Sequence, residues 1–220
     1  MIITLNNIDL FYEKTGEGKP FILAHGNGES HEIFDETVNL LSKKYCVYAV
    51  DTRGHGQSSK TAEYNYQDIA DDFVAFIKQL NLEKPIFYGF SDGGIVGLLI
   101  ALQHPELLSK LIVSGANVTP SGLKNKWLFL FRFLYFFTRN KKIKMMLRQP
   151  NISSRELSQI TVPTLVLAGQ KDIIKQKHTR YIANQITNSH LKIIEGENHG
   201  SYIIHNTKLL EIIGDFITYT

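Results

Sequence analysis

The amino-acid sequence predicts one α/β domain with a mostly parallel, twisted sheet, because two patterns alternate along the chain. Short runs rich in β-branched and aromatic residues are followed by stretches whose apolar residues recur every three or four positions, the period of an amphipathic helix. Most of the short runs are apolar without interruption, which is typical of strands covered by helices on both faces. The length of 220 residues suits a single domain with a full hydrophobic core.

The expected strands begin with a hairpin, Ile2 to Leu5 and Asp9 to Tyr12, with Asn6 and Asn7 near its turn. The later strands are expected at Phe21 to Ala24, Cys46 to Val50, Ile86 to Tyr88, Leu111 to Ser114, Thr164 to Ala168 and Leu191 to Ile194. Two of the expected helical faces consist of Ile69, Phe73, Phe76, Ile77 and Leu80, and of Ile203, Leu209, Ile212, Ile213 and Phe216. A sheet of this kind places its ligand site beyond the carboxyl ends of the strands.

The composition is that of an ordinary globular protein, with 43% apolar and 20% charged residues. The N-terminus has no basic segment followed by an apolar run, and no stretch approaches the roughly 18 unbroken apolar residues of a membrane span. The single cysteine, Cys46, cannot form an intramolecular disulfide, which is consistent with a reducing compartment. We therefore expect a cytoplasmic protein without a secretory signal or a transmembrane helix.

A candidate nucleophile, Ser91, lies in the run Gly89-Phe90-Ser91-Asp92-Gly93-Gly94, between an expected strand and an expected helix. A Gly-x-Ser-x-Gly run in this setting is typical of a sharp turn that lifts the serine hydroxyl into the open. The glycines are needed because side chains at their positions would collide with the crossing strand and helix. The helix N-terminus also favours negative charge that develops beside the serine.

A serine nucleophile needs a base and a third group that orients the base. Of the eight histidines, His199 is the one that follows an expected strand in a loop before the last helix. Asp172 follows the strand Thr164 to Ala168, so all three candidates are expected at the same end of the sheet. The chain order Ser91, Asp172, His199 is the order that α/β-hydrolases use. We therefore predict that these three residues form a catalytic triad.

Hydrolysis of an ester also requires N–H donors that stabilise the oxyanion of the tetrahedral intermediate. The backbone N–H of Asp92, directly after the nucleophile, is the first expected donor. The second is expected from the loop His25-Gly26-Asn27-Gly28, where we assign it to the N–H of Asn27. The side chain of Asp92 is interpreted in two ways: as an acid that stabilises the first helical turn, or as a binding group for a cationic substrate.

These motifs, together with Asp51-Thr52-Arg53-Gly54-His55-Gly56-Gln57-Ser58, resemble the α/β-hydrolase family over nearly the whole chain. The resemblance implies an α/β-hydrolase fold with a small helical cap, no cofactor and no metal. It also implies that Asp51 and Arg53 brace their loop and that His25 shapes the oxyanion loop. Gly89 to Ile95 and Gly115-Ala116-Asn117 are similar to valacyclovir-hydrolase-like esterases in particular. Family members usually have a larger cap than the roughly 45 residues available here between Ser114 and Thr164.

The expected domain therefore consists of a core, residues 1–116 and 156–220, and a short cap insert, residues 117–155. The insert has a net charge of +9, against −6 for the rest of the chain. Its run from Trp127 to Phe137 is apolar except for Arg132, so one packed face could not bury it as a helix. We expect it to line an acyl pocket, with Trp127 and Phe131 as substrate-binding residues. Contact with an anionic membrane surface or with a second copy of the chain is the alternative.

The sequence predicts a serine hydrolase that cleaves a small-molecule acyl ester through an acyl-enzyme intermediate. A thioesterase, an amidase, a lactonase or a carbon–carbon bond hydrolase would use the same triad, and a non-catalytic receptor could retain it. No His-Glu-x-x-His run, cysteine pair or phosphate-loop lysine motif is present, so metal and nucleotide enzymes are not expected. Nucleic acid is also not expected, because the basic insert is rich in exposed-looking aromatic residues.

Overall fold

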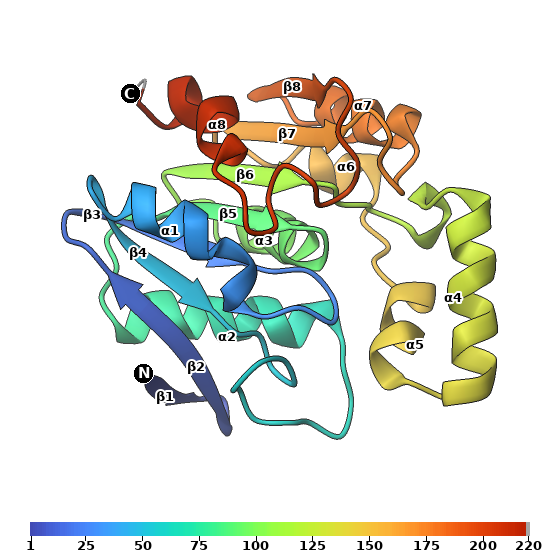
Figure 1. The fold of residues 1–220 in the computed structure, drawn as a ribbon, viewed down its shortest axis with the longest axis horizontal. Helices are drawn as coiled ribbons and strands as arrows, with labels where there is room; N and C mark the ends of the chain where they lie inside the picture. The colour runs from blue at the N-terminus through green and yellow to red at the C-terminus, as the bar shows by residue number, and fades with distance from the viewer. Residues whose placement is uncertain (219–220) are drawn as a thin grey trace.

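The computed structural model describes residues 1–218, in which one eight-stranded sheet forms the centre (Figure 1). The order across the sheet is β1-β2-β4-β3-β5-β6-β7-β8. The pairs β1–β2 and β2–β4 are antiparallel, and the pairs from β4–β3 to β7–β8 are parallel. The strands are β1 (Ile2–Leu5), β2 (Ile8–Thr15), β3 (Lys19–Ala24), β4 (Tyr45–Val50), β5 (Ile86–Phe90), β6 (Lys110–Ser114), β7 (Thr164–Gly169) and β8 (Ser189–Ile194). The predicted fold class, a mostly parallel sheet with helices on both faces, is confirmed.

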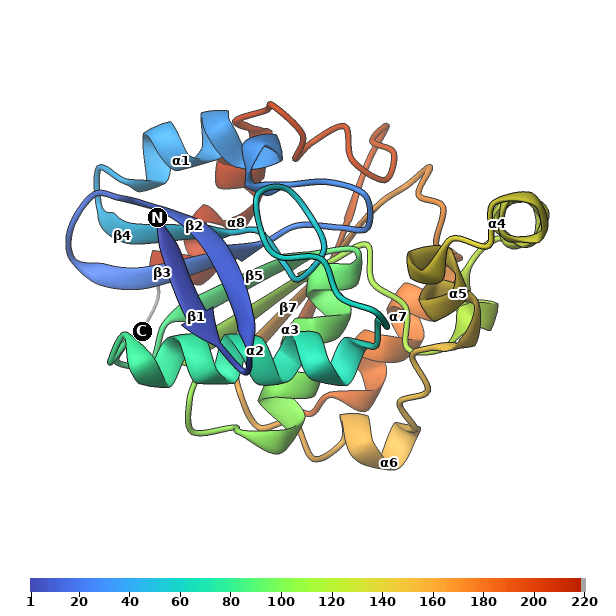
Figure 2. The same ribbon diagram turned by 90° about the horizontal axis from the view of Figure 1, so that it is seen from below.

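Helices cover both faces of the sheet (Figure 2). The helices on one face are α1 (Asp35–Leu41), preceded by the 3-10 helix η1 (His31–Phe34), and α8 (Lys208–Thr218). The helices on the other are α2 (Tyr66–Gln79), α3 (Asp92–Gln103), the short α6 (Ser154–Leu157) and α7 (Gln176–Gln185). The predicted face of the last helix was wrong at one position, because the buried Ile203 lies in a turn before α8 begins at Lys208.

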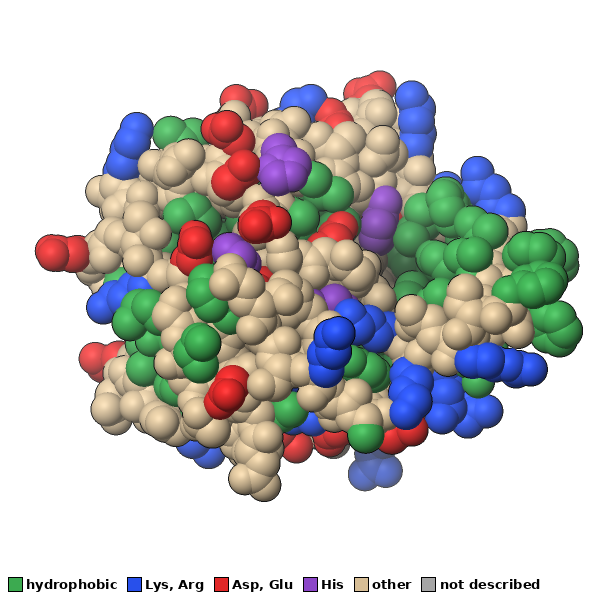
Figure 3. Space-filling model, turned by 60° about the horizontal axis from the view of Figure 1, so that its bottom comes forward, with side chains coloured by type: hydrophobic (Ala, Val, Ile, Leu, Met, Phe, Trp, Pro, Cys, Tyr) green, Lys and Arg blue, Asp and Glu red, His purple; other side chains and the backbone are tan. Residues whose placement is uncertain are grey.

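The insert contains the 3-10 helix η2 (Pro120–Gly122) and two helices, α4 (Asn125–Thr138) and α5 (Lys141–Arg148). Both helices stand beside the body of the molecule, and α4 lies farther out (Figures 1 and 2). Apolar side chains gather over this part of the surface in Figure 3. The expected boundary of the insert stays a prediction. Among the described residues, none of the helices combines the length and the apolar character that crossing a bilayer requires.

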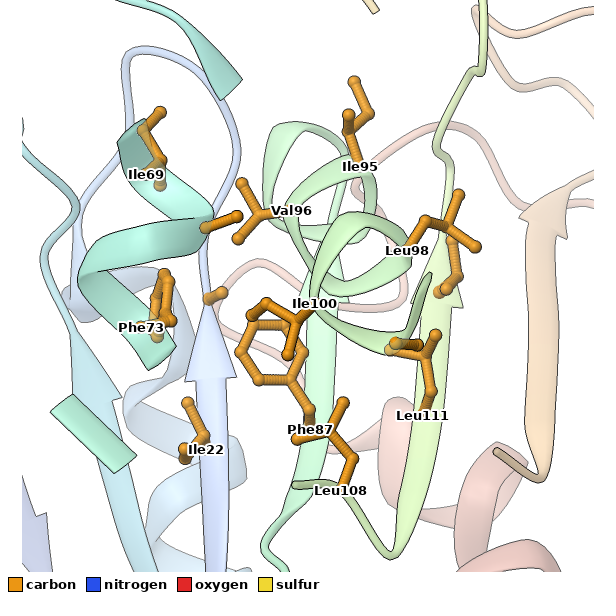
Figure 4. Close-up of a cluster of buried hydrophobic side chains, with 14 of the residues drawn as sticks. Ile22, Ile69, Phe73, Phe87, Ile95, Val96, Leu98, Ile100, Leu108 and Leu111 are labelled. Atoms are coloured by element: carbon orange, nitrogen blue, oxygen red, sulfur yellow. The ribbon is translucent and has the colours of Figure 1, made fainter. Parts of the chain in front are cut away.

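The core beneath the candidate site is formed by α3, which is apolar nearly all round and packs on the sheet beside α2 (Figure 4). Phe73 of α2, Phe87 of β5 and Ile100 of α3 meet in this cluster, and each is at most 1% exposed. A helix that is apolar on every side is stable only when it is buried on every side. The N-terminus of α3, next to the candidate nucleophile, is therefore held rigidly in place.

Candidate active site

The tight turn between β5 and α3 holds Ser91 in a backbone conformation that is rare for a residue with a side chain, with φ at 52° and ψ at −112°. Its N–H donates to the carbonyl of Ser114 in β6 at 2.7 Å. A Cβ at Gly89 would lie 2.1 Å from the carbonyl oxygen of Gly93, and one at Gly93 would lie 2.2 Å from that of Ala24. The glycines thus allow the strand and the helix to approach closely, and Ser91 accepts the strain.

The structure brings Ser91, His199 and Asp172 into one hydrogen-bonded series, although they come from three separate loops. His199 Nε2 lies 3.1 Å from Ser91 Oγ, and its Nδ1 lies 2.7 Å from Asp172 Oδ1. The same carboxylate oxygen accepts the N–H of Ile174 at 2.9 Å, which orients the buried carboxylate. This arrangement can remove a proton from the serine hydroxyl while the carboxylate holds the imidazole in place.

Two further residues position the imidazole of His199, and the sequence analysis assigned a role to neither. The ring of Phe90 packs against the imidazole with 4.9 Å between the ring centres. Gly115, with φ at 63°, lies below it, and a Cβ there would be 2.8 Å from His199 Cε1. The sequence contains a signal for the second residue, because a glycine directly after a strand indicates close approach of another group.

The expected oxyanion loop begins with His25, whose burial lowers the pKa to about 4, so the ring is neutral at pH 7. Its Nδ1–H donates to the carbonyl of Gly26 at 2.7 Å, while Nε2 accepts the N–H of Thr52 at 3.0 Å. Glu29, which the sequence analysis did not single out, accepts the N–H of Gly26 at 2.9 Å. These bonds fix the loop from both sides, which agrees with the interpretation of His25 as a structural residue.

Within residues 1–218, the backbone N–H groups of Asn27 and Asp92 have no protein acceptor, so both are available to a substrate oxygen. The structure thus leaves both expected donors unoccupied in the loops beside Ser91, and their role in the oxyanion hole stays a prediction.

Comparison with known proteins identifies the family. The family model described as the alpha/beta hydrolase fold matches residues 19–144. The AB hydrolase superfamily protein YisY of Bacillus subtilis is 29% identical over an alignment that covers 98% of this chain and 97% of YisY. The serine hydrolase BPHL of Homo sapiens is 27% identical, with coverage of 98% of this chain and 85% of BPHL. The esterase EaEST from Exiguobacterium antarcticum superposes with a TM-score of 0.87, at 22% identity and with 99% of each chain covered.

The chain belongs to the alpha/beta hydrolase fold family. The expected family and the expectation of a hydrolase are therefore confirmed. The alignment with YisY runs over 263 positions although this chain has 220 residues, so it contains gaps in this chain.

The carboxylate of Asp92 in this hydrolase lies between two internal donors. Oδ2 accepts from the side-chain amide of Asn27 at 2.9 Å, and Oδ1 accepts from the hydroxyl of Tyr66 at 2.8 Å. Burial raises the pKa of Asp92 to about 6, even though both hydrogen bonds favour the charged form. The carboxylate therefore links the oxyanion loop to α2, a connection that the sequence does not reveal because Tyr66 is remote in the chain.

The motif after β4 links other parts of the molecule, as the resemblance implied. The buried Asp51 accepts the N–H groups of His31 and Gln57, which ties the loop to η1. The guanidinium of Arg53 donates to both carboxylate oxygens of Asp72 in α2, each at 2.7 Å. Both side chains thus act as structural braces.

A pocket of about 450 Å³ opens beside His199, between the loops after β7 and β8 and the start of α4. Its walls consist of Lys124, Lys126, Trp127, Lys171, Asp172, Ile173, Asn198 and His199. Trp127 thus lines the same pocket as His199, whereas Phe131 contacts Trp127 at 6.3 Å between ring centres and is not a wall residue of this pocket. No cluster of three or more potential metal-ligating side chains occurs in the part of the chain that the structure describes.

Proposed function

We propose that this hydrolase cleaves carboxylic esters through an acyl-enzyme intermediate, with Ser91 as the nucleophile. The observation that carries the proposal is the continuous series from Ser91 Oγ through His199 to Asp172 at 3.1 and 2.7 Å. Hydrogen bonds of this length connect nucleophile, base and orienting acid in the same sense as in other serine hydrolases.

In the first half of the reaction, Ser91 Oγ attacks the ester carbonyl carbon while His199 Nε2 takes its proton. Asp172 Oδ1 accepts the Nδ1–H of His199, and its negative charge stabilises the imidazolium. The N–H groups of Asn27 and Asp92 bind the oxyanion of the tetrahedral intermediate. Collapse of the intermediate breaks the bond to the alcohol, which leaves with the proton from His199.

In the second half, a water molecule attacks the acyl-enzyme and His199 again accepts the proton. The second tetrahedral intermediate releases the carboxylic acid and returns the proton to Ser91 Oγ. Each step uses one proton transfer at His199 Nε2, so the reaction balances without a cofactor.

Esters are the proposed substrate class because the similar proteins include an esterase and a serine hydrolase, and because an alcohol leaves more readily than an amine. Trp127 contributes an apolar wall for the acyl or alcohol part of a small molecule. Phe131 packs against Trp127 beside this pocket, where a longer substrate would reach it. Asp92 would select esters with a cationic group, because a carboxylate can accept about four hydrogen bonds and here accepts two from the protein.

The proposal is tested with p-nitrophenyl esters of increasing acyl length, with the matching anilides as a second substrate series. Ser91→Ala should lower kcat by roughly 10⁶-fold, since the members of a triad act as a unit. Ser154→Ala, at an exposed serine on α6, is the matched control and should retain full activity. Turnover of esters by Ser91→Ala at the wild-type rate would contradict the assignment, and preference for the anilides would replace esters by amides.

A further inference from the structure

Four phenylalanines on α4 form one exposed stripe, which we call the aromatic face. Phe129, Phe133, Phe136 and Phe137 are 71%, 52%, 64% and 66% exposed. Their spacing of four, three and one positions places them on the same side of the helix. Single exposed apolar residues are normal on a protein surface, but a contiguous patch of large aromatic side chains indicates an interaction site.

None of the other elements within residues 1–218 covers this face. The inner side of α4, represented by Trp127, Phe131 and Tyr135, is half-buried, and the packing neighbours of α4 are α5 and η2. No residue of α4 is fully buried. Figures 1 and 2 show the helix standing clear of the body in two perpendicular views. The expectation that the aromatic run lines a pocket therefore does not extend to its outer half, because α5 and η2 pack against the other side of the helix.

The surroundings of the aromatic face are strongly basic. Residues 117–155 carry nine Lys and Arg side chains and no Asp or Glu. Lys126, Arg132 and Arg139 are exposed on α4 or at its end, and Figure 3 shows basic side chains on either side of the apolar patch. Glu63 pairs with Lys141 and Lys144 of α5 and neutralises only part of this charge.

We propose that the aromatic face of α4 docks on an anionic lipid surface. Aromatic side chains enter the boundary between headgroups and acyl chains, while the flanking Lys and Arg side chains bind the negatively charged headgroups. With 14 residues, α4 is about 21 Å long, which is shorter than the roughly 30 Å hydrocarbon core. The helix therefore lies in the plane of the interface.

Charge decides between a lipid surface and a second copy of this chain. A twofold dimer through α4 would place the +9 insert against its own image, because such an interface uses the same patch on both subunits. An anionic membrane carries the charge opposite to that of the insert and therefore attracts it. The remaining residues, with a net charge of −6, are repelled from the same surface, so the charge division also orients the molecule with α4 toward the lipid.

Docking in this orientation brings the active-site pocket beside the membrane. Trp127, near the start of α4, lines the pocket that contains His199. The inference does not depend on ester hydrolysis, because it concerns binding and can be measured on the Ser91→Ala variant.

The test is co-sedimentation of the full chain with vesicles of phosphatidylcholine alone or mixed with phosphatidylserine, at low and high salt. We expect at least about tenfold stronger binding to the anionic vesicles, reduced by salt that screens charges beyond roughly 10 Å. Phe129→Gln/Phe133→Gln/Phe136→Gln should lower binding at least about tenfold, and glutamine keeps the helix propensity high. Lys126→Gln/Arg132→Gln should lower it by roughly 25-fold, since each basic residue near the surface contributes about fivefold.

Matched controls replace exposed residues away from α4. Ile2→Gln/Leu40→Gln removes apolar surface from β1 and α1, and Lys43→Gln/Lys44→Gln removes two basic side chains after α1. Both should bind vesicles like the wild type. Absence of binding to anionic vesicles at low salt overturns the proposal, as does wild-type binding by the triple Phe variant with an unchanged circular dichroism spectrum. A third outcome is a wild-type dimer in analytical ultracentrifugation, a monomeric triple variant, and no binding to vesicles. That outcome would assign the aromatic face to contact with a second copy of the chain instead.

Discussion

The turn that carries Ser91 is tightly packed by its surroundings, whereas the helix α4 is largely exposed. Around Ser91, a single added carbon at Gly89 or Gly93 would meet a backbone oxygen at 2.1 or 2.2 Å. On α4, four phenylalanines are each more than half exposed, and the helix contains no buried residue. The first region holds reacting groups in position and tolerates little change. The second is free to bind something outside the molecule, so the two regions should respond to substitution very differently.

The same substitution at two phenylalanines measures this difference directly. Phe73→Ala in the core should lower the free energy of unfolding by about 3–5 kcal/mol, because the buried ring contacts Phe87 and leaves a cavity. Phe129→Ala on α4 should change it by less than about 0.5 kcal/mol. Urea denaturation of both variants is the measurement. A cost at Phe129 similar to that at Phe73 would mean that α4 is packed against the body in solution.

Substitution of two glycines with positive φ, Gly115 and Gly196, distinguishes the effect of backbone strain from the effect of a clash with the imidazole of His199. Ala at Gly115 would place a Cβ 2.8 Å from His199 Cε1, so the ring must move, and ester turnover should fall by roughly 100-fold. Gly196, with φ at 74°, has no atom within 4 Å of its added carbon, so Gly196→Ala should cost about 1 kcal/mol of stability and little activity. Equal loss of activity in both variants would show that strain alone is responsible.

The buried carboxyl of Asp92 predicts a pH dependence of stability. Its pKa is about 6 in the folded protein and lies at its usual value near 3.8 once the chain unfolds. Between these values the folded state keeps a proton that the unfolded state has released, so stability falls as pH rises from about 4 to 6. Asp92→Asn lacks this titration, and its stability relative to the wild type should rise by on the order of 2 kcal/mol over that interval.

Urea denaturation of both proteins at pH 4 and pH 7 measures the difference, with the wild type as its own reference at each pH. The same change with pH in both proteins would mean that the carboxyl titrates as an exposed aspartate does. The contribution of Asp92 to stability should also level off above about pH 7, where the carboxyl is ionised in both states.

The sequence predicts what short local patterns determine. The eight strands and the strand–turn–helix at Ser91 follow from apolar runs and glycine spacing, and Asp172 and His199 follow from their places after strands. Contacts between remote segments are not encoded in such patterns. The bonds of Asp92 with Tyr66 and Asn27, and the place of Gly115 under His199, depend on how loops from different strands meet.

The aromatic run from Trp127 to Phe137 is a second case in which the sequence pattern does not predict the contacts. Its composition predicts a helix that one packed face cannot bury, but periodicity does not indicate which residues face the neighbour. In the structure Phe131 is half-buried and packs against Trp127, whereas Phe129 is exposed, and α5 and η2 are the elements against which α4 packs. Helix α5 in turn contacts the body through the buried Met145 and through Lys142, which donates to the carbonyl of Gly54, far away in the sequence.

The most direct test of the account is covalent labelling of the nucleophile. A fluorophosphonate should phosphonylate Ser91 Oγ in the wild type, and peptide mass spectrometry should locate one adduct on the peptide that contains Ser91. His199→Ala should react far more slowly, because no base removes the hydroxyl proton, and Ser91→Ala should not react. An adduct on another serine, or labelling of Ser91→Ala at the wild-type rate, would contradict the proposed catalytic centre.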